Sequence, residues 1–168
     1  LTSSGTSGIP SKIFLDRENA NNQRKVLNKI VGSVIGDARL PMLIIDKNLY
    51  NIKRNTFNAR AAAIHGFSIF GKAHTFLLDE SDRIDYKLLN SFLEKNSHNK
   101  FFVFGFTSFV YEYLLKKLSQ KLLKYNFRNG ILLHGGGWKK MEKIKVSNKI
   151  FKQRLFNKLK LKTIHNYY

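Results

Sequence analysis

Lys100–Phe106 reads Lys-Phe-Phe-Val-Phe-Gly-Phe, and Thr107–Tyr125 continues it as Thr-Ser-Phe-Val-Tyr-Glu-Tyr-Leu-Leu-Lys-Lys-Leu-Ser-Gln-Lys-Leu-Leu-Lys-Tyr. The first part is a continuous apolar run of strand length, typical of a strand buried on both faces of a parallel sheet. The second part has apolar residues at helical spacing, after Thr107 or Ser108 as a capping residue. A buried strand that leads into the longest helix of the chain predicts an α/β fold with a mostly parallel sheet and flanking helices.

The same alternation of strand and helix patterns extends over the rest of the chain. Strands are predicted at Lys12–Leu15, Pro41–Ile45, Ala73–Leu78, Gly130–Leu133 and Thr163–Tyr168. Helices are predicted from Asp16 to Val31 with Gly32 as the stop, over Phe57–Ile64 with His65-Gly66 as its end, after Asp82 or Asp85, and over Asn148–Lys160 after Ser147. Because ligands of such sheets bind at the carboxyl ends of the strands, we expect Gly105–Thr107, His134–Trp138 and Tyr168 to meet at one edge.

The first residues, Leu1–Lys12, read Leu-Thr-Ser-Ser-Gly-Thr-Ser-Gly-Ile-Pro-Ser-Lys. Glycines let the backbone present bare N–H groups, and consecutive N–H groups in a turn form an anion site. The hydroxyls and the lysine are suited to a phosphate chain, although three residues separate Gly8 from Lys12, which is not the common P-loop spacing. A flexible Ser/Gly linker is the alternative interpretation. The candidate phosphate ligands are Ser3, Ser4, Gly5, Thr6, Ser7, Gly8 and Lys12.

A second glycine-rich stretch, Gly130–Glu142, reads Gly-Ile-Leu-Leu-His-Gly-Gly-Gly-Trp-Lys-Lys-Met-Glu. An apolar strand runs directly into Gly135, Gly136 and Gly137 and then into the only tryptophan, Trp138. Such a triplet allows a ligand to approach the backbone closely. His134, at the strand end, is a candidate catalytic residue or a hydrogen-bonded structural histidine, and Trp138 lines a pocket or fills the core.

These stretches resemble a known family. The order Ser-Ser-Gly-Thr-Ser-Gly-x-Pro-x-Lys is similar to the phosphate loop of adenylate-forming enzymes, with one extra residue, Ser11, before the lysine. His-Gly-Gly-Gly-Trp-Lys-Lys, together with Val103–Leu115, Lys145–Phe151 and the closing Ile164–Tyr168, looks like the LuxE-type acyl-protein synthetases of fatty-acid reductase systems. The resemblance covers the whole chain in the same order.

The resemblance implies a reaction, its cofactors and its partners. ATP, with Mg²⁺, and a fatty or other carboxylic acid form an acyl-adenylate, and the acyl group then passes to a protein thiol, in luminescence or a related pathway. The thiol belongs either to sequence outside residues 1–168 or to a partner protein such as an acyl reductase. It implies that Ser3–Gly8 and Lys12 form the phosphate loop, and Lys12 and His134 are the candidate catalytic residues. It implies Gly135–Gly137 near the adenine and acyl-phosphate and Tyr168 on the adenine. The candidate adenine and acyl ligands are Gly105, Thr107, Gly135, Gly136, Gly137, Trp138 and Tyr168.

The resemblance also implies a partial domain. In the family a Gly-Met-x-Glu motif and a further subdomain follow, and strands precede the phosphate loop. We therefore expect residues 1–168 to be part of the large N-terminal subdomain, truncated at both ends and inactive alone. With no cysteine, the chain has no thiol to accept an acyl group.

Composition favours a folded cytoplasmic protein. Hydrophobic residues make up 43% of the 168 residues, which argues against disorder, and there is neither a membrane-spanning run nor a signal-peptide pattern. No set of metal ligands is apparent. The acidic residues Asp79, Glu80, Asp82 and Asp85 lack the spacing of an EF-hand and suit a helix N-terminus instead.

The net charge is +19, from 30 Lys+Arg and 11 Asp+Glu, and the excess lies in the second half. A field of this sign attracts polyanions, so a basic nucleic-acid or polyanion-binding module is the alternative function. The lysines alternate with core-like apolar residues, which is typical of solvated helix faces. We expect no sequence-specific nucleic-acid partner.

Overall fold

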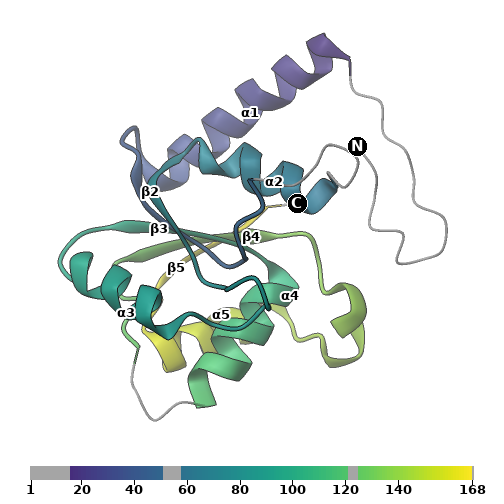
Figure 1. Cartoon of the computed structure of the whole chain (residues 1–168). Coiled ribbons are helices and arrows are strands. Elements are labelled where there is room, and N and C mark those ends of the chain that lie inside the picture. The colour runs from purple at the N-terminus through teal and green to yellow at the C-terminus, as the bar shows by residue number, and fades with distance from the viewer. Residues whose placement is uncertain (1–15, 51–57, 121–124, 168) are drawn as a thin grey trace.

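A five-stranded, all-parallel sheet forms the centre of the molecule (Figure 1). The computed structural model describes residues 16–50, 58–120 and 125–167. The strand order is β2-β1-β3-β4-β5. The strands are β1 (Leu40–Ile44), β2 (Gly71–Phe76), β3 (Phe101–Phe106), β4 (Gly130–Gly135) and β5 (Thr163–Tyr167).

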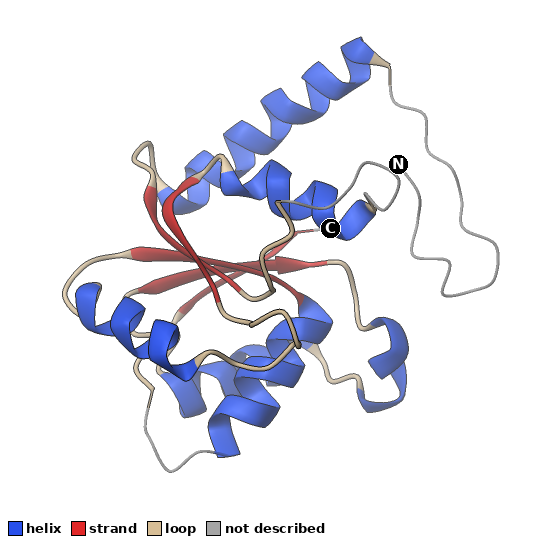
Figure 2. Ribbon diagram, in the orientation of Figure 1, coloured by secondary structure: helices blue, strands red, loops and turns tan. Residues whose placement is uncertain are grey.

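Helices cover both faces of this sheet (Figure 2). One face carries α1 (Arg17–Ile35) and α2 (Ala59–Ser68), and the other carries α3 (Tyr86–Lys95), α4 (Thr107–Phe109) and α5 (Asn148–Leu159). This three-layer arrangement confirms the predicted α/β fold with a parallel sheet. No helix in the described part of the chain is both long and apolar enough to cross a bilayer.

The continuous apolar runs became the inner strands, because parallel strands are buried on both faces. Successive side chains alternate between two hydrophobic clusters. Phe102, Phe104 and Leu133 pack on the side of α1 and α2. Val103 and Leu132 pack on the side of α3 and α5.

Side-chain caps fix the starts of α1, α3 and α5 as the sequence predicts. The Asp16 carboxylate accepts a hydrogen bond from the Asn19 N–H at 2.7 Å, and Ser147 accepts one from Ile150 at 3.3 Å. Of the two candidates before α3, Asp85 is the cap, accepting from the Leu88 N–H.

Several predicted boundaries are wrong. α1 continues through Gly32 to Ile35, and α2 continues through His65-Gly66 to Ser68. A helix-internal glycine costs only about 1 kcal/mol relative to alanine, which packing readily offsets. β4 extends to Gly135, and β2 runs over Gly71–Phe76 instead of Ala73–Leu78.

The helix after β3 also differs from the prediction. Neither Thr107 nor Ser108 caps it, since the N-cap is Phe106 without a side-chain bond. α4 leads into the π-helix η2 (Val110–Lys117) and the 3₁₀ turn η3 (Leu118–Gln120). Within the described residues α1 is longer than this segment.

The edge strand β2 is irregular where it pairs with β1. Pro41 lies opposite Lys72 and Leu43 opposite Thr75, so two residues of β2 face the single Met42. One of the two is Ala73, which has a positive φ of 47°. Such a bulge bends a strand and interrupts its ladder.

Candidate functional site

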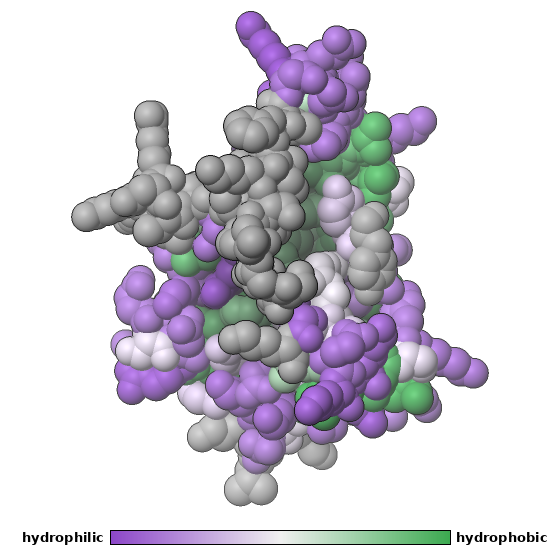
Figure 3. Space-filling model, turned by 90° about the vertical axis from the view of Figure 1, so that its right-hand side faces the viewer, coloured by the Kyte–Doolittle hydropathy of each residue, from purple (hydrophilic) through white to green (hydrophobic). Residues whose placement is uncertain are grey.

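At the carboxyl edge of the sheet, the glycine triplet at the end of β4 lies beside the ends of β3 and β5. In the register of the sheet, Gly135 lies beside Phe106 of β3 and Tyr167 of β5. Figure 3 views the molecule from the side where β4 ends, and hydrophobic surface is visible there between hydrophilic regions. The predicted convergence of Thr107 and His134–Trp138 at this edge is therefore present.

The space around the α-carbon differs among the three glycines of the loop. A Cβ at Gly135 would collide with the carbonyl oxygen of Tyr167, and one at Gly136 would lie 2.6 Å from Cδ1 of Phe106. Gly136 and Gly137 also have positive φ angles, 75° and 68°, which residues with a side chain rarely adopt. Only at Gly137 would a Cβ point into open space. The protein's own packing thus requires the first two glycines, and Gly137 leaves room beside the loop.

An apolar cavity of about 440 Å³ adjoins this loop on the α2 side of the sheet. Its volume is within the range of small-molecule pockets. Phe67 of α2 stacks on Phe104 at 4.3 Å between ring centroids and meets the Tyr167 ring edge-on at 5.1 Å, which builds an aromatic wall. The lining residues are Ala63, Phe67, Phe104, Phe106, Gly135, Gly136, Gly137 and Tyr167.

His134 lies on the other face of β4, away from the apolar cavity. Its Nδ1 is 2.9 Å from the Thr107 Oγ1, and this hydroxyl donates to the Gly135 carbonyl oxygen at 3.1 Å. The hydroxyl has one proton, so Nδ1–H of the ring donates to Thr107 and Nε2 keeps its lone pair. The chain His134–Thr107–Gly135 therefore fixes the start of the glycine loop.

The His134 ring is neutral at physiological pH. Its side chain is buried, and burial lowers its pKa to about 4, with a further lowering by the charge of Lys152 and an opposing effect of Asn166. Nε2 of His134 and Oδ1 of Asn166 are both buried and have no hydrogen-bond partner among the described residues. A ring in this state can accept a hydrogen bond through Nε2, but it is a poor proton donor.

His134 and Asn166 line a second cavity, of about 390 Å³, on the α5 side of β4. Trp138 lines it and is also part of the core, where it packs edge-on against Phe151 with centroids 5.8 Å apart. Gly137 lines both cavities. The structure thus separates the predicted ligands into two groups on opposite faces of β4.

The remaining predicted site residues have different positions. Gly105 lies inside the sheet, where a Cβ would be 2.8 Å from Ile45 Cβ, and it lines neither cavity. The phosphate loop Ser3–Lys12, the predicted strand Lys12–Leu15 and Tyr168 lie outside the described residues. No group of three metal-ligating side chains occurs within the part of the chain that the structure describes.

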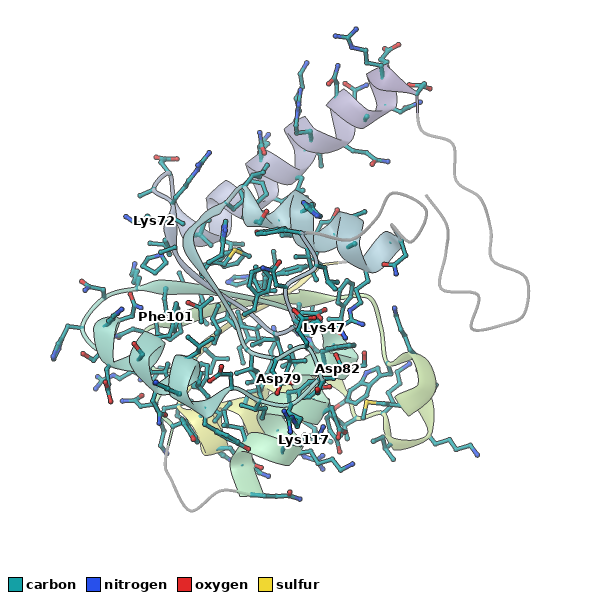
Figure 4. The ribbon with its side chains drawn as sticks, in the orientation of Figure 1. Lys47, Lys72, Asp79, Asp82, Phe101 and Lys117 are labelled. Atoms are coloured by element: carbon teal, nitrogen blue, oxygen red, sulfur yellow. The ribbon has the colours of Figure 1, made fainter. Side chains whose placement is uncertain are left out.

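The sequence does not predict the buried ion pair at the end of β1. Asp46 is 1% exposed and receives two hydrogen bonds from the Arg60 guanidinium, from Nε at 2.7 Å and from Nη2. Arg60 also lies over the Phe109 ring, 4.4 Å from its centroid, and so joins α2 to α4. Lys47, the residue after Asp46, pairs with Asp82 at 3.2 Å. Figure 4 labels both Lys47 and Asp82.

The acidic run predicted to serve a helix N-terminus is used in several ways. Asp85 caps α3, and Asp82 pairs with Lys47. Asp79 accepts from the backbone N–H groups of Ser81 and Arg83 and pairs with the Arg83 side chain. These bonds explain the run without a cation.

A parallel α/β domain with an apolar cavity beside a glycine loop at the carboxyl edge of its strands defines the class of small-molecule-binding α/β proteins. Comparison with known families narrows this class: the model of the acyl-protein synthetase family LuxE matches residues 1–168. The chain belongs to this family, and membership implies an acyl substrate and a protein acceptor. No curated protein and no solved structure matches it.

Proposed function

We propose that this domain activates a fatty or other hydrophobic carboxylic acid with ATP, as part of an acyl-protein synthetase. The carboxylate oxygen bonds to the α-phosphorus of ATP and pyrophosphate leaves, which gives the acyl-adenylate. A thiolate of the acceptor protein then attacks the acyl carbon, forms the thioester and releases AMP. Because the chain has no cysteine, the thiol belongs to other residues of the protein or to a partner.

The observation that carries the proposal is the apolar cavity at the glycine loop. Its side chains are aromatic or aliphatic, apart from the Tyr167 hydroxyl, so it offers an acyl chain apolar contact and offers adenine few hydrogen-bonding groups. We assign this cavity to the hydrophobic part of the acid. Ser3–Gly8 and Lys12 would hold the ATP phosphates, and Tyr168 the adenine; Mg²⁺ would neutralise phosphate charge.

His134 has a positioning role in this proposal. Forming the acyl-adenylate transfers no proton, and a buried neutral imidazole would supply none. Its bond to Thr107 holds the Gly135 carbonyl and so keeps the open side of Gly137 at the cavity.

The test is to fill the cavity from α2. Ala63→Leu adds a larger apolar side chain to the wall, while Ala62→Leu adds the same side chain one residue away, where it does not line the cavity. In the intact protein that carries this sequence, acid-dependent ATP–pyrophosphate exchange gives KM values for acids of increasing length. Ala63→Leu should raise the KM for long acids about tenfold or more, since about 1.4 kcal/mol of lost contact corresponds to a factor of ten.

The KM for ATP should not change in Ala63→Leu, and Ala62→Leu should behave as wild type. A raised KM for ATP with an unchanged KM for the acids would contradict the assignment and give the cavity to the adenine. Absence of acid-dependent exchange in the wild-type protein would contradict the proposed activity itself.

A further inference from the structure

The buried pair of Asp46 with Arg60 holds the helix that forms one wall of the apolar cavity. Asp46 is itself fixed to the sheet, since its carboxylate accepts a hydrogen bond from the Lys47 N–H at 2.7 Å and its carbonyl oxygen accepts one from the Leu78 N–H at 3.1 Å. Arg60 donates to the carboxylate from both Nε and Nη2, and this two-point contact fixes the plane of the guanidinium. The start of α2 is therefore tied to the carboxyl end of β1.

The spacing along α2 places Arg60 on the side of the helix that faces the cavity. Ala63 and Phe67 line the cavity, and they follow Arg60 by three and seven residues. In an α-helix, residues at these spacings share one face. Arg60 itself does not line the cavity, so its effect on a ligand passes through the position of α2 and through the side chains that it contacts.

Aromatic contacts connect Arg60 to the opposite wall of the cavity as well. The guanidinium lies over the Phe109 ring, and Phe109 meets Phe106 edge-on with centroids 6.4 Å apart. Phe106 contacts Phe104 at 6.1 Å, and Phe104 stacks on Phe67. This series of contacts begins and ends on α2, and its last three members, Phe106, Phe104 and Phe67, are walls of the cavity.

We propose that Asp46 and Arg60 are positioning residues that set the width of the apolar cavity and thereby its preference for long acids. The inference rests on the proposed function, because it takes this cavity as the site of the acyl chain. A long acid gains apolar contact only where both walls are held at contact distance, whereas a short acid fills little of the cavity. Loosening α2 therefore weakens the binding of long acids more than that of short ones.

The experiment measures the binding of dodecanoate and hexanoate to the intact protein by isothermal titration calorimetry, without ATP. Arg60→Lys keeps a cation beside Asp46, so the carboxylate retains a partner, but lysine has no planar fork for a two-point contact. The preference for dodecanoate, taken as the ratio of the two association constants, should fall about fourfold or more, which is the contribution of about one buried methylene group. In ATP–pyrophosphate exchange, the KM for dodecanoate should rise by a similar factor while the KM for ATP stays unchanged.

Arg83→Lys is the matched control, since it makes the same change in the Asp79–Arg83 pair, where the arginine side chain is 77% exposed. This variant should keep the wild-type preference, because an exposed ion pair contributes little to holding its elements. Phe109→Leu tests the second connection. It keeps the buried ion pair and removes the ring that Arg60 covers, and it should lower the preference for dodecanoate as well.

Several results would overturn the inference. If wild-type protein prefers dodecanoate and Arg60→Lys keeps that preference, the inference fails while the proposed function stands. An equal weakening of both acids in Arg60→Lys would show that the pair only stabilises the fold, and an equal loss of preference in Arg83→Lys would show that the effect is not specific to the buried pair. If wild-type protein binds both acids equally, the cavity does not hold the acyl chain, which contradicts both the assignment of the cavity and this inference.

Discussion

The burial of His134 makes the stability of the fold depend on pH. Burial, helped by the charge of Lys152, lowers the pKa of the ring from 6.5 in the unfolded chain to about 4 in the folded one. Between these values the unfolded state binds more protons, so the free energy of unfolding rises with pH in this window. The stabilisation is present above 6.5 and is lost as pH falls toward 4.

The size of the effect follows from this difference in pKa. Linkage gives a loss of about 2 kcal/mol between pH 7 and pH 5 and about 3 kcal/mol by pH 4, at 1.36 kcal/mol for each factor of ten in proton affinity. Denaturant unfolding at pH 7, 6 and 5 measures it in the wild-type protein and in His134→Asn, which keeps an N–H donor near Thr107. The variant should lack most of the loss.

His98, which is exposed, provides the control. Its change to Asn also removes a histidine but leaves the buried His134 and its contact with Thr107 in place, so the pH dependence of unfolding should stay as in wild type. Burial also lowers the pKa of His165, and that contribution is common to all three proteins. Parallel curves for wild type and His134→Asn between pH 7 and pH 5 would refute the reasoning.

Three further predictions concern the Asp46–Arg60 ion pair, the predicted phosphate loop, and the glycines Gly136 and Gly32. Asp46→Ala leaves Arg60 without its partner and should reduce the free energy of unfolding by about 3 kcal/mol. Glu142→Ala breaks an exposed ion pair and should change it by less than about 1 kcal/mol. Denaturant unfolding measures both variants, and equal effects would contradict a buried Asp46–Arg60 pair. Gly5→Val or Lys12→Ala should lower acid-dependent ATP–pyrophosphate exchange about tenfold or more, because one charge-assisted phosphate contact is lost; normal exchange in both would remove the phosphate-loop assignment. Gly136→Ala should lower the melting temperature, because its positive φ costs about 1–2 kcal/mol of stability and its Cβ would conflict with Phe106. Gly32→Ala, inside α1, should raise the melting temperature. The opposite order would contradict the packing described.

The fold could be predicted where burial on both sides of the sheet dominates. β1, β3 and β4 are continuous apolar runs because their residues face helices on both sides, and such runs are visible in a sequence. β2 was misplaced by two residues because Lys72–Thr75 are polar or small, as suits an edge strand. The π-helical turns of η2 have no comparable signal, since their side chains follow the same apolar spacing as an α-helix.

The glycine loop could be predicted as a place of close approach, but the cavity beside it could not. Its other wall is Ala63 and Phe67 of α2, about seventy residues earlier in the chain, and only the tertiary packing brings them together. The sequence also gives no indication that His134 and Gly135, which are neighbours, face opposite sides of β4. That follows from strand alternation once the strand is known to extend to Gly135.

The bulge at Ala73 bears on how the folded protein behaves at high concentration. β2 is an outer strand of the sheet in the described residues, and an outer strand with a regular backbone offers its free N–H and C=O groups to any extended chain. Here the extra residue breaks the spacing of those groups, and the exposed Lys72, labelled in Figure 4, places a charge beside them. An incoming strand could not form a regular hydrogen-bond ladder with β2 and would meet the charge of Lys72. This edge of the sheet therefore resists the edge-to-edge pairing that leads to fibrils.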